Sequence, residues 1–298
     1  GKYDDATKTY EVAIKRYPTS LTLRMQGLNA YRQASQSELA TDSKNQIMRL
    51  LQSSPSRYAS RDNLVAAGRY FAMLGEDARQ ILEAFYDRVR DADPEHVEAY
   101  VATAELALQK GDYKVAADTL AAAQRFDESD PRIPFLLARA WESSDPVKAN
   151  AAITASLKLN PNHAPSLLYQ ADAAIDRERY PEAEELLRQV LTVNPHEQDA
   201  WAMMAVVAHL KGRFEKELLL RKAALSTWKE NPRVDYLIGK KLSQKYRFEE
   251  GAEYQRKALE FDPTYAPARF QLAQDLLRLG NEDVGWEVAR LVAEEDQY

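Results

Sequence analysis

The sequence contains no cysteine, few glycines and no long apolar segment. Without cysteine there is no disulfide, no thiol nucleophile and no thiolate metal ligand, whereas a cytosolic and a periplasmic location both stay open. No run approaches the roughly 18 apolar residues that a membrane-spanning helix needs, so we expect no membrane insertion. The 10 glycines among 298 residues fall well below the usual share of about 7%. Because glycine marks turns, its scarcity and the long stretches of Ala, Leu, Glu, Lys and Arg predict an all-α protein.

An excess of basic residues is also lacking, since 40 Lys and Arg stand against 46 Asp and Glu, a net charge of −6. Nucleic acids and anionic membranes favour basic surfaces, so we expect neither as a partner. The charge is uneven: residues 1–74 contain 11 basic and 6 acidic side chains, which gives +5 there and leaves −11 for the rest. This asymmetry either steers an acidic partner to the amino-terminal end or only reflects how solvated surfaces are filled.

Motifs of the common catalytic and cofactor-binding sites are missing. GxGxxG, GxxxxGK[ST] and GxSxG do not occur, so phosphate-binding loops of these types and a nucleophile elbow are not expected. Three histidines are expected in loops, and the fourth lies in a helical segment without a second histidine at HxxxH spacing: His96, His163, His196 and His209. The sequence therefore predicts no catalytic residue, no metal ligand and no cofactor.

Two pairs of adjacent glutamates could suggest an acid–base couple. They are Glu184 with Glu185, and Glu249 with Glu250. Adjacent residues of a helix point about 100° apart, so the two carboxylates of a pair do not face one substrate. We interpret both pairs as solvated helix surfaces and expect no enzymatic activity in this chain.

The sequence does contain an internal repeat. The stretch RYPEAEELLRQVLTVNPHEQDAW, residues 179–201, shows the end of one copy and the beginning of the next. Aligning the chain with itself gives copies that begin 33 or 34 residues apart and keep this register through six successive starts. These starts are Val97, Pro131, Ala164, Gln198, Pro232 and Ala266.

Fixed positions of the repeat have a physical explanation. The eighth position is small in all six copies, because a larger side chain would separate two packed helices: Ala104, Ala138, Ala171, Ala205, Gly239 and Ala273. An aromatic residue opens the second helix in four copies: Tyr113, Tyr180, Phe214 and Phe248. Proline in NPN, NPH or DPT follows the second helix and ends it, since proline cannot donate the next helical hydrogen bond.

These columns resemble the tetratricopeptide repeat, a 34-residue helix–turn–helix unit. Residues 198–231 match the family pattern at Trp201, Met204, Ala205, Gly212, Phe214 and Ala224. They depart from it at Glu217, where a small residue belongs, and at Lys229, where proline belongs. The resemblance covers nearly the whole chain. It implies an α-solenoid of stacked antiparallel helix pairs, wound as a right-handed superhelix whose first helices line the concave face.

The repeat also predicts the domain organisation. The first residues match the second half of a repeat, and the following copy is about eight residues too long, with the polar stretch RQASQSELATDSK at 32–44 where a short turn belongs. Because the chain begins without methionine or a signal-like segment, we expect it to be part of a longer protein. We expect a single solenoid of about eight helix pairs after an initial unpaired helix, divided at 1–20, 21–62, 63–96, 97–130, 131–163, 164–197, 198–231, 232–265 and 266–298.

The resemblance implies that partners bind to side chains of the first helices. The second, fifth and ninth positions of each repeat are the candidates on this face, and the residues singled out below come from the fifth and ninth. We expect an apolar track flanked by charges of both signs to receive an extended or helical segment of another protein. The alternative is that the fifth-position side chains pack against the preceding repeat. The candidate residues are Val101, Glu105, Phe135, Arg139, Leu168, Asp172, Tyr236, Lys240, Phe270 and Gln274.

Four alternatives for the partner or the function follow from the same pattern. Chaperone-binding members of the family grip a terminal carboxylate with lysine, arginine and asparagine, but here Val101, Glu105 and Leu136 occupy the matching positions and argue against it. Single-stranded RNA is disfavoured by the net charge of −11 beyond residue 74. An enzymatic domain outside this chain is a third alternative. Self-association is the fourth, because the last repeat has no capping helix and should expose Trp286, Val288, Leu291 and Val292.

Overall fold

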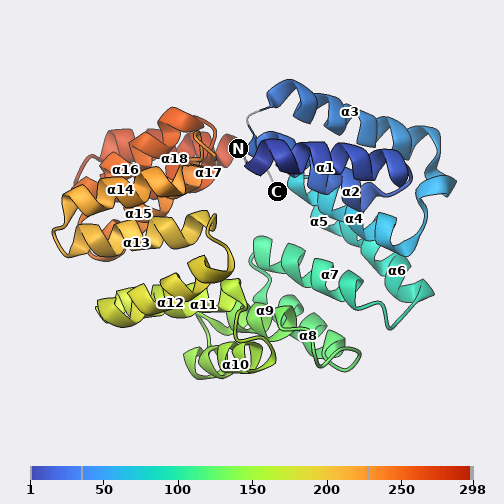
Figure 1. The fold of residues 1–298 in the computed structure, drawn as a ribbon, viewed down its shortest axis with the longest axis horizontal. Coiled ribbons are helices and arrows are strands. Elements are labelled where there is room, and N and C mark those ends of the chain that lie inside the picture. The colour runs from blue at the N-terminus through green and yellow to red at the C-terminus, as the bar shows by residue number, and fades with distance from the viewer. Residues whose placement is uncertain (1, 35, 227, 296–298) are drawn as a thin grey trace. The chain divides into compact units, whose positions relative to one another are not determined.

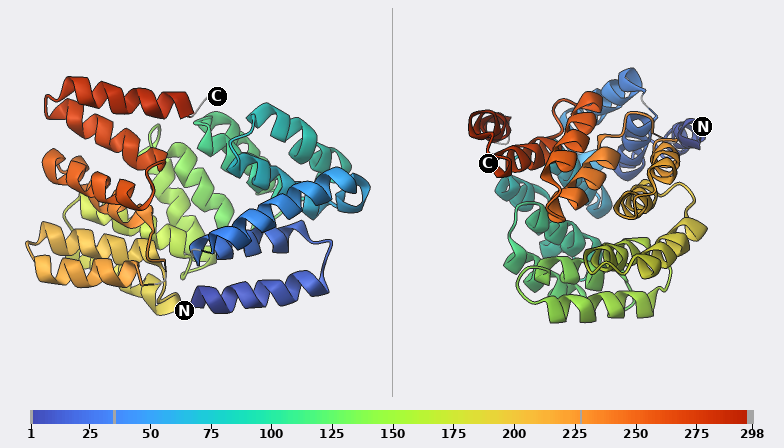
Figure 2. Two further views of the ribbon diagram at one scale, coloured as in Figure 1. Left: turned by 90° about the horizontal axis from the view of Figure 1, so that it is seen from above. Right: turned by 90° about the vertical axis from the view of Figure 1, so that its left-hand side faces the viewer.

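The computed structural model describes residues 2–34, 36–226 and 228–295, and within these ranges every regular element is a helix (Figure 1). The chain divides into two compact units, Gly1–Ser166 and Leu167–Tyr298, which we call the N-terminal unit and the C-terminal unit. Antiparallel helix pairs build each of them, and Figure 2 shows the pairs from two further directions. The prediction of an all-α solenoid is therefore confirmed.

The N-terminal unit begins with a helix that packs against the first helix pair. First helices contact the first helices that follow them, as α2 does with α4, α4 with α7, and α7 with α9. The second helix of the second pair is interrupted by a π-helical segment, η2. The elements are α1 (Lys2–Arg16), α2 (Leu21–Gln33), α3 (Ser37–Ser53), η1 (Pro55–Tyr58), α4 (Arg61–Met73), α5 (Ala78–Ile81), η2 (Leu82–Tyr86), α6 (Asp87–Ala92), α7 (Val97–Gln109), α8 (Tyr113–Ala123), α9 (Arg132–Trp141) and α10 (Pro146–Leu159).

The C-terminal unit repeats the same plan with more regular pairs. The first helices again contact one another, α13 with α15 and α15 with α17, and each packs against its own second helix. Its elements are α11 (Ala164–Asp176), which begins just before the boundary, α12 (Tyr180–Val193), α13 (Gln198–Leu210), α14 (Phe214–Ala224), α15 (Pro232–Gln244), α16 (Phe248–Phe261), α17 (Ala266–Arg278) and α18 (Glu282–Glu295).

The predicted repeat starts coincide with helix starts at five places, the first residues of α7, α11, α13, α15 and α17. The sixth, Pro131, lies one residue before α9, for which it is the N-cap. In several pairs the chain turns between the two helices through a glycine with positive φ, at Gly75, Gly111, Gly212 and Gly280. The division of the chain into repeats at the boundaries given above stays a prediction.

The expected long turn at residues 32–44 was wrong. Helix α2 continues to Gln33 and α3 already begins at Ser37, so the extra residues of this copy lengthen a helix. Ala40 and Ile47 of α3 are buried against Leu28 and Tyr70. Because Ala40 and Ile47 are seven residues apart, two helical turns, the apolar stripe runs through the polar stretch and stabilises it as a helix.

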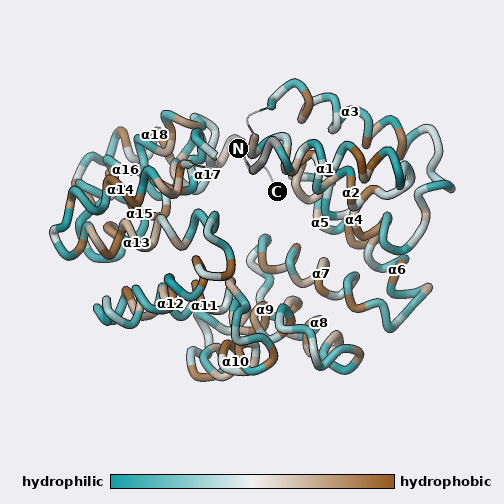
Figure 3. Tube along the Cα trace, viewed as in Figure 1, coloured by the Kyte–Doolittle hydropathy of each residue, from teal (hydrophilic) through white to brown (hydrophobic). Residues whose placement is uncertain are grey.

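The small residues of the eighth position lie in the core, as predicted. Ala104, Ala138, Ala171 and Ala205 are fully buried, and Figure 3 shows hydrophobic and hydrophilic residues interspersed along the helices. The closest approach involves Gly239 of α15 and Gly251 of α16. A Cβ atom on Gly239 would lie 2.8 Å from the carbonyl oxygen of Gly251. Alanine therefore does not fit there, which explains why this copy has glycine in the alanine column.

Candidate partner-binding groove

The fifth-position candidates differ in their exposure. Val101 is fully buried, so it cannot contact a partner, and its inclusion among the binding residues was wrong. Phe135 is half-buried with its ring edge against His163, at a centroid distance of 5.5 Å. Tyr236 is half-buried in the same way against Tyr265, at 5.7 Å. Each contact covers part of a ring within its own repeat, so neither shows the expected alternative, which was packing against the preceding repeat.

Leu168 and Phe270 complete the fifth-position set. Leu168 is half-buried, whereas Phe270 exposes 54% of its surface. Among the fifth-position residues, Phe270 therefore presents a large apolar surface to solvent. The structure places Phe270 and the candidates Tyr236 and Lys240 in the C-terminal unit, on neighbouring first helices α15 and α17.

The ninth-position side chains are mostly engaged within the protein. Glu105 accepts hydrogen bonds from Arg69 at 2.9 and 3.1 Å, and Arg139 lies 3.5 Å from Glu142, the C-cap residue of its helix. In the C-terminal unit Lys241, which is 4% exposed, lies 2.8 Å from Asp172. Of the two further candidates, Lys240 is half-buried and Gln274 is exposed. The ammonium group of Lys240 lies 6.0 Å from the ring centre of Tyr236.

Charged side chains at the second position of successive repeats pair with one another. Arg132 of α9 lies 2.9 Å from Glu98 of α7, and Arg233 of α15 lies 2.7 Å from Asp199 of α13. Each pair joins residues 34 apart in the sequence, which is one repeat. Arg69 of α4 adds a third member, 2.6 Å from Glu98. The charges on the first helices therefore bridge neighbouring repeats.

The pKa of Glu98 is below its ordinary value for this reason. Burial of the carboxyl raises its pKa. The hydrogen bonds from Arg132 and Arg69 and the positive charges of both arginines together lower it by more than burial raises it. Glu98 is therefore ionised at neutral pH and its charge is neutralised by both arginines. A ligand at this place does not need to supply an opposite charge.

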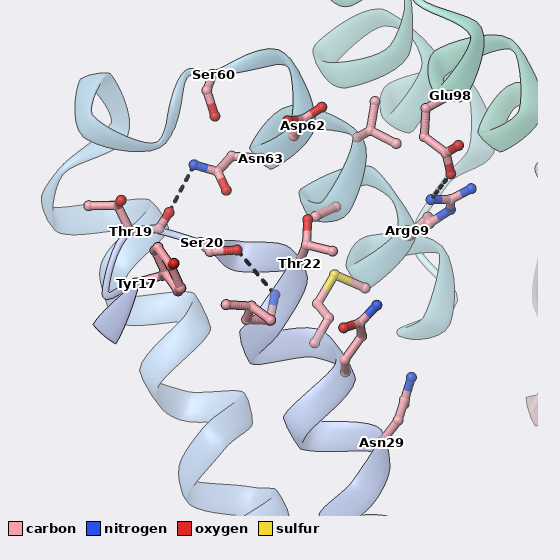
Figure 4. A pocket seen from close by; sticks show the side chains of 15 residues that line it. Tyr17, Thr19, Ser20, Thr22, Asn29, Ser60, Asp62, Asn63, Arg69 and Glu98 are labelled. Atoms are coloured by element: carbon pink, nitrogen blue, oxygen red, sulfur yellow. Dashed lines mark hydrogen bonds and ion pairs between the residues drawn. The ribbon is translucent and has the colours of Figure 1, made fainter. Parts of the chain in front are cut away.

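A groove in the N-terminal unit lies beside this ion-pair cluster (Figure 4). Its volume is about 690 Å³, and it is lined by the turn before α2, by α2, by the start of α4 and by Glu98 of α7. Most lining side chains are uncharged and carry hydrogen-bonding groups. We call it the N-terminal groove, defined by Tyr17, Thr19, Ser20, Thr22, Leu23, Met25, Gln26, Asn29, Ser60, Asp62, Asn63, Val65, Ala66, Arg69 and Glu98.

Asn63 fixes the end of the groove by joining two repeats. Its amide oxygen accepts a hydrogen bond from the backbone N–H of Leu21 at 2.8 Å, and its amide nitrogen donates to the carbonyl oxygen of Thr19 at 2.9 Å. Ser20 is the N-cap of α2 and accepts from the backbone N–H of Leu23. The buried Asn63 amide thus holds the first turn of α2 against α4.

One face of α2 presents unused hydrogen-bonding groups to the groove. Thr22, Gln26 and Asn29 line it and are exposed. They lie at i, i+4 and i+7, which places them on one face of the helix. Among the described residues none of the three side chains has a hydrogen-bond partner, so all three can bind a ligand at no cost of a broken bond.

The repeat pattern of the sequence did not predict this groove. Copies 21–62 and 63–96 match the repeat columns poorly, so no candidate was assigned on α2 or α4. A signal was present in the helical spacing of this segment. Thr22, Gln26 and Asn29 recur at the spacing of one helix face and are polar, whereas Leu21 and Leu28 recur at helical spacing on another face and are buried. The spacing predicts one buried and one polar face, but it does not say that the polar face borders a cavity.

The histidine in a helix also has partners that the sequence did not predict. The two ring nitrogens of His209 lie 2.8 Å from Glu217 Oε2 and 2.9 Å from Glu250 Oε2. Glu250 in turn accepts two hydrogen bonds from Arg247. Glu250 and Glu184, which lies 3.0 Å from Lys211, are therefore not merely solvated as expected. His209 and Glu217 are both buried, so this cluster holds α13, α14 and α16 together and is not accessible to a substrate.

Within the described ranges no group of three or more His, Cys, Asp or Glu side chains is arranged to hold a metal ion. None of the helices in the same ranges has the length and apolar character required to cross a bilayer.

Comparison with known proteins agrees with the geometry. Family models described as tetratricopeptide repeat match residues 62–131 and 140–207. A chain in the crystal structure of the APC/C hetero-tetramer Cut9–Hcn1 superposes with a TM-score of 0.58 and 14% identity, over 92% of this chain and 52% of that chain. This chain thus spans about half the length of that one.

A tetratricopeptide repeat protein from Parabacteroides merdae superposes with a TM-score of 0.55 and 14% identity, over 90% of this chain and 99% of that one. No curated protein matches the chain in a sequence search. Proteins with this fold are in general interaction scaffolds that bind other proteins. The family models thus identify tetratricopeptide repeats within residues 62–131 and 140–207, and the helix pairs and the similar structures show the same fold.

Proposed function

We propose that the chain is a non-catalytic protein-interaction module whose N-terminal groove binds an extended segment of a partner protein. The observation that supports this most strongly is the row of exposed, unpartnered side chains Thr22, Gln26 and Asn29 along a groove of about 690 Å³. Pockets that bind ligands commonly have volumes of about 300 to 1,000 Å³.

The chemistry of the row fits a polypeptide backbone. Each of the amides of Gln26 and Asn29 supplies both donors and an acceptor, which match the N–H and C=O groups of an extended segment. Residues i and i+7 of a helix are about 10 Å apart along its axis at a rise of roughly 1.5 Å per residue. This span corresponds to about three residues of extended chain at roughly 3.3 Å each.

The charges beside the groove favour an uncharged contact. Arg69 and Glu98 neutralise each other, so a ligand gains little by adding a third charge. Asp62 lines the groove as well and is highly exposed, with its side chain at 81%. A polar, uncharged segment therefore fits this place better than a strongly acidic one.

Selection of a random peptide library on the full chain tests the proposal. Peptides that are enriched are synthesised, and their dissociation constants are measured for wild type and for Gln26→Ala/Asn29→Ala. We expect the double variant to weaken binding at least about tenfold, which corresponds to roughly 1.4 kcal/mol. Since both side chains are exposed and unpartnered, the helical melting curve should not change.

A matched control removes the same two groups elsewhere. Gln80 and Asn150 are exposed in α5 and α10 and are not among the residues that line the N-terminal groove. The variant Gln80→Ala/Asn150→Ala should bind the selected peptides like wild type. Equal affinity of all three proteins would show that the peptides bind outside the groove and would refute the proposal.

The C-terminal unit offers a second candidate surface for partner contact on α15 and α17. Phe270 and Gln274 are exposed, and Tyr236 and Lys240 lie on the preceding first helix.

Self-association is supported by Trp286, which is 64% exposed on α18. Val288 of the same helix instead packs against the cluster around Leu272. A strictly monomeric sedimentation profile at high concentration would contradict self-association.

A further inference from the structure

A second cavity in the N-terminal unit is apolar and shares no lining residue with the N-terminal groove. Its volume is about 460 Å³, and its walls come from α3, η1, α4, η2 and α6. Five large side chains of the walls are only half-buried, so they expose apolar surface to the cavity. We call it the aromatic pocket and define it by these residues: Met48, Leu51, Leu64, Phe71 and Phe85.

The π-helical segment accounts for one aromatic wall. A π turn contains an extra residue, and such turns are frequent at functional sites. Tyr86 of η2 is buried against Gly68 of α4, where any Cβ atom would collide with the tyrosine ring. With Tyr86 fixed in this way, the preceding Phe85 stacks on Phe71 with ring centroids 5.3 Å apart and planes inclined by 20°. The two rings form a flat apolar surface.

The charged residue that lines the aromatic pocket is an arginine, and the segment that forms its α3 and η1 walls is basic. Residues 43–61 contain four Lys and Arg and no Asp or Glu. Arg88 lines the pocket, and Arg57 lies on η1, which forms part of the wall. Both are exposed, and Arg88 donates only a long hydrogen bond of 3.4 Å to the carbonyl oxygen of Ala84. No ion pair of either arginine is found among the described residues.

We propose that the aromatic pocket binds an acidic segment of another protein, with one large apolar side chain inserted between Phe71 and Leu51. The half-buried rings supply the apolar contact area, and carboxylates flanking the inserted side chain pair with Arg57 and Arg88. This chemistry agrees with the net charge of +5 of residues 1–74. The site is independent of the N-terminal groove, whose lining favours uncharged segments.

Fluorescence anisotropy with labelled synthetic peptides tests the inference on the full chain. The probe has a central phenylalanine flanked on both sides by Asp and Glu, and two comparison peptides replace the acidic residues by serine or the phenylalanine by alanine. We expect only the first peptide to bind well. Arg57→Glu/Arg88→Glu should weaken its binding at least about tenfold, and rising salt should weaken it as well.

Two further variants make the test specific. Ala59 lines the pocket and is exposed, so Ala59→Phe should fill the cavity and abolish binding without disturbing the core. Arg125 is an exposed arginine that follows α8 in the same unit, so Arg125→Glu is the charge control and should bind like wild type. Circular dichroism melting curves confirm that each variant is folded.

Several outcomes would overturn the inference. Wild type could fail to bind the acidic peptide, or Ala59→Phe could bind it as well as wild type does. Loss of binding in Gln26→Ala/Asn29→Ala instead would assign the peptide to the groove. If sedimentation showed a wild-type dimer that Ala59→Phe dissociates, the pocket would be occupied by a second copy of this chain.

Discussion

The imidazole of His209 is bonded to a carboxylate at each ring nitrogen. A carboxylate only accepts, so both nitrogens must donate, and the ring is an imidazolium when both bonds are formed. The hydrogen bond to Glu217 and then that to Glu250 raise the pKa of His209, against the effect of burial and of the positive charge of Arg247. Burial raises the pKa of Glu217, but the hydrogen bonds from His209 and Tyr254, with the positive charges nearby, lower it by more. The pKa of Glu217 therefore lies below its ordinary value.

The sign of the resulting pH dependence follows from linkage. The folded protein binds the His209 proton more tightly than the unfolded chain, so this stabilisation is complete below about pH 6.5, the ordinary pKa of histidine. It is lost as the pH rises through the folded pKa. Conversely, the lowered pKa values of Glu217 and Glu250 give stability above about pH 4.3, their ordinary value, that is lost in more acidic solution.

We therefore predict that His209→Gln removes a pH-dependent part of the stability. Glutamine keeps a polar side chain but cannot carry the charge, and Glu217 is left buried at 3% exposure without its cation. The cost at pH 6 should be on the order of 3 kcal/mol and should shrink as the pH rises. Urea unfolding of both proteins from about pH 5 to about pH 9, a range that includes the ordinary histidine pKa, measures this difference. A difference that does not change with pH would contradict a charged His209.

At the scale of helices, the approach of α15 and α16 depends on two glycines. A Cβ atom at Gly239 would meet the Gly251 carbonyl oxygen at 2.8 Å and the side-chain nitrogen of Gln255 at a still shorter distance. The carbonyl belongs to a rigid helix backbone and cannot turn away. The helices must then separate, and part of the packing in the C-terminal unit is lost.

We predict that Gly239→Ala destabilises the protein by about 1 to 3 kcal/mol, although alanine favours a helix over glycine by about 1 kcal/mol. Gly285→Ala is the comparison, because the atoms that its Cβ would meet at 2.9 Å, Cδ2 and Cγ of Leu277, belong to a side chain and not to a backbone carbonyl. Its loss should be smaller. Thermal unfolding by circular dichroism measures both, and a more stable Gly239→Ala protein would refute the close-packing explanation.

The helix pairs could be predicted because their determinants are local and periodic. Ala104, Ala138 and Ala205 recur at one register, and each is fully buried where two helices meet. The turns were harder to predict, since Glu178 and Tyr246 in the turns after α11 and α15 adopt positive φ values of 60° and 61°, which residues other than glycine usually avoid. The π segment η2 was not predictable, because it depends on the fit of Tyr86 over Gly68 in another helix.

The exposure of the candidate binding residues could be predicted less well than the fold. Position in the repeat correctly assigned Phe270 and Gln274 to exposed places but could not separate them from the buried Val101. Exposure depends on the contacts between successive first helices, which one repeat does not encode. Ion pairs such as Arg132 with Glu98 likewise join different repeats, so the charge pattern of a single copy does not reveal which charges stay free.

For the whole molecule, the proposed binding surfaces lie on separate repeats. Each repeat of a solenoid contacts mainly its neighbours, so a ligand bound to one stretch of first helices stabilises that stretch first. The N-terminal groove involves residues of α2, α4 and α7. Its occupancy should therefore be visible as local protection in the N-terminal unit.

Hydrogen–deuterium exchange with a library-selected peptide tests the central claim most directly. The amides of α2 and of the first turns of α4 should exchange more slowly with saturating peptide, and those of the C-terminal unit should not change. In Gln26→Ala/Asn29→Ala the same peptide concentration should give little protection. Protection confined to α11–α18, or equal protection in the double variant, would contradict the assignment of partner binding to the N-terminal groove.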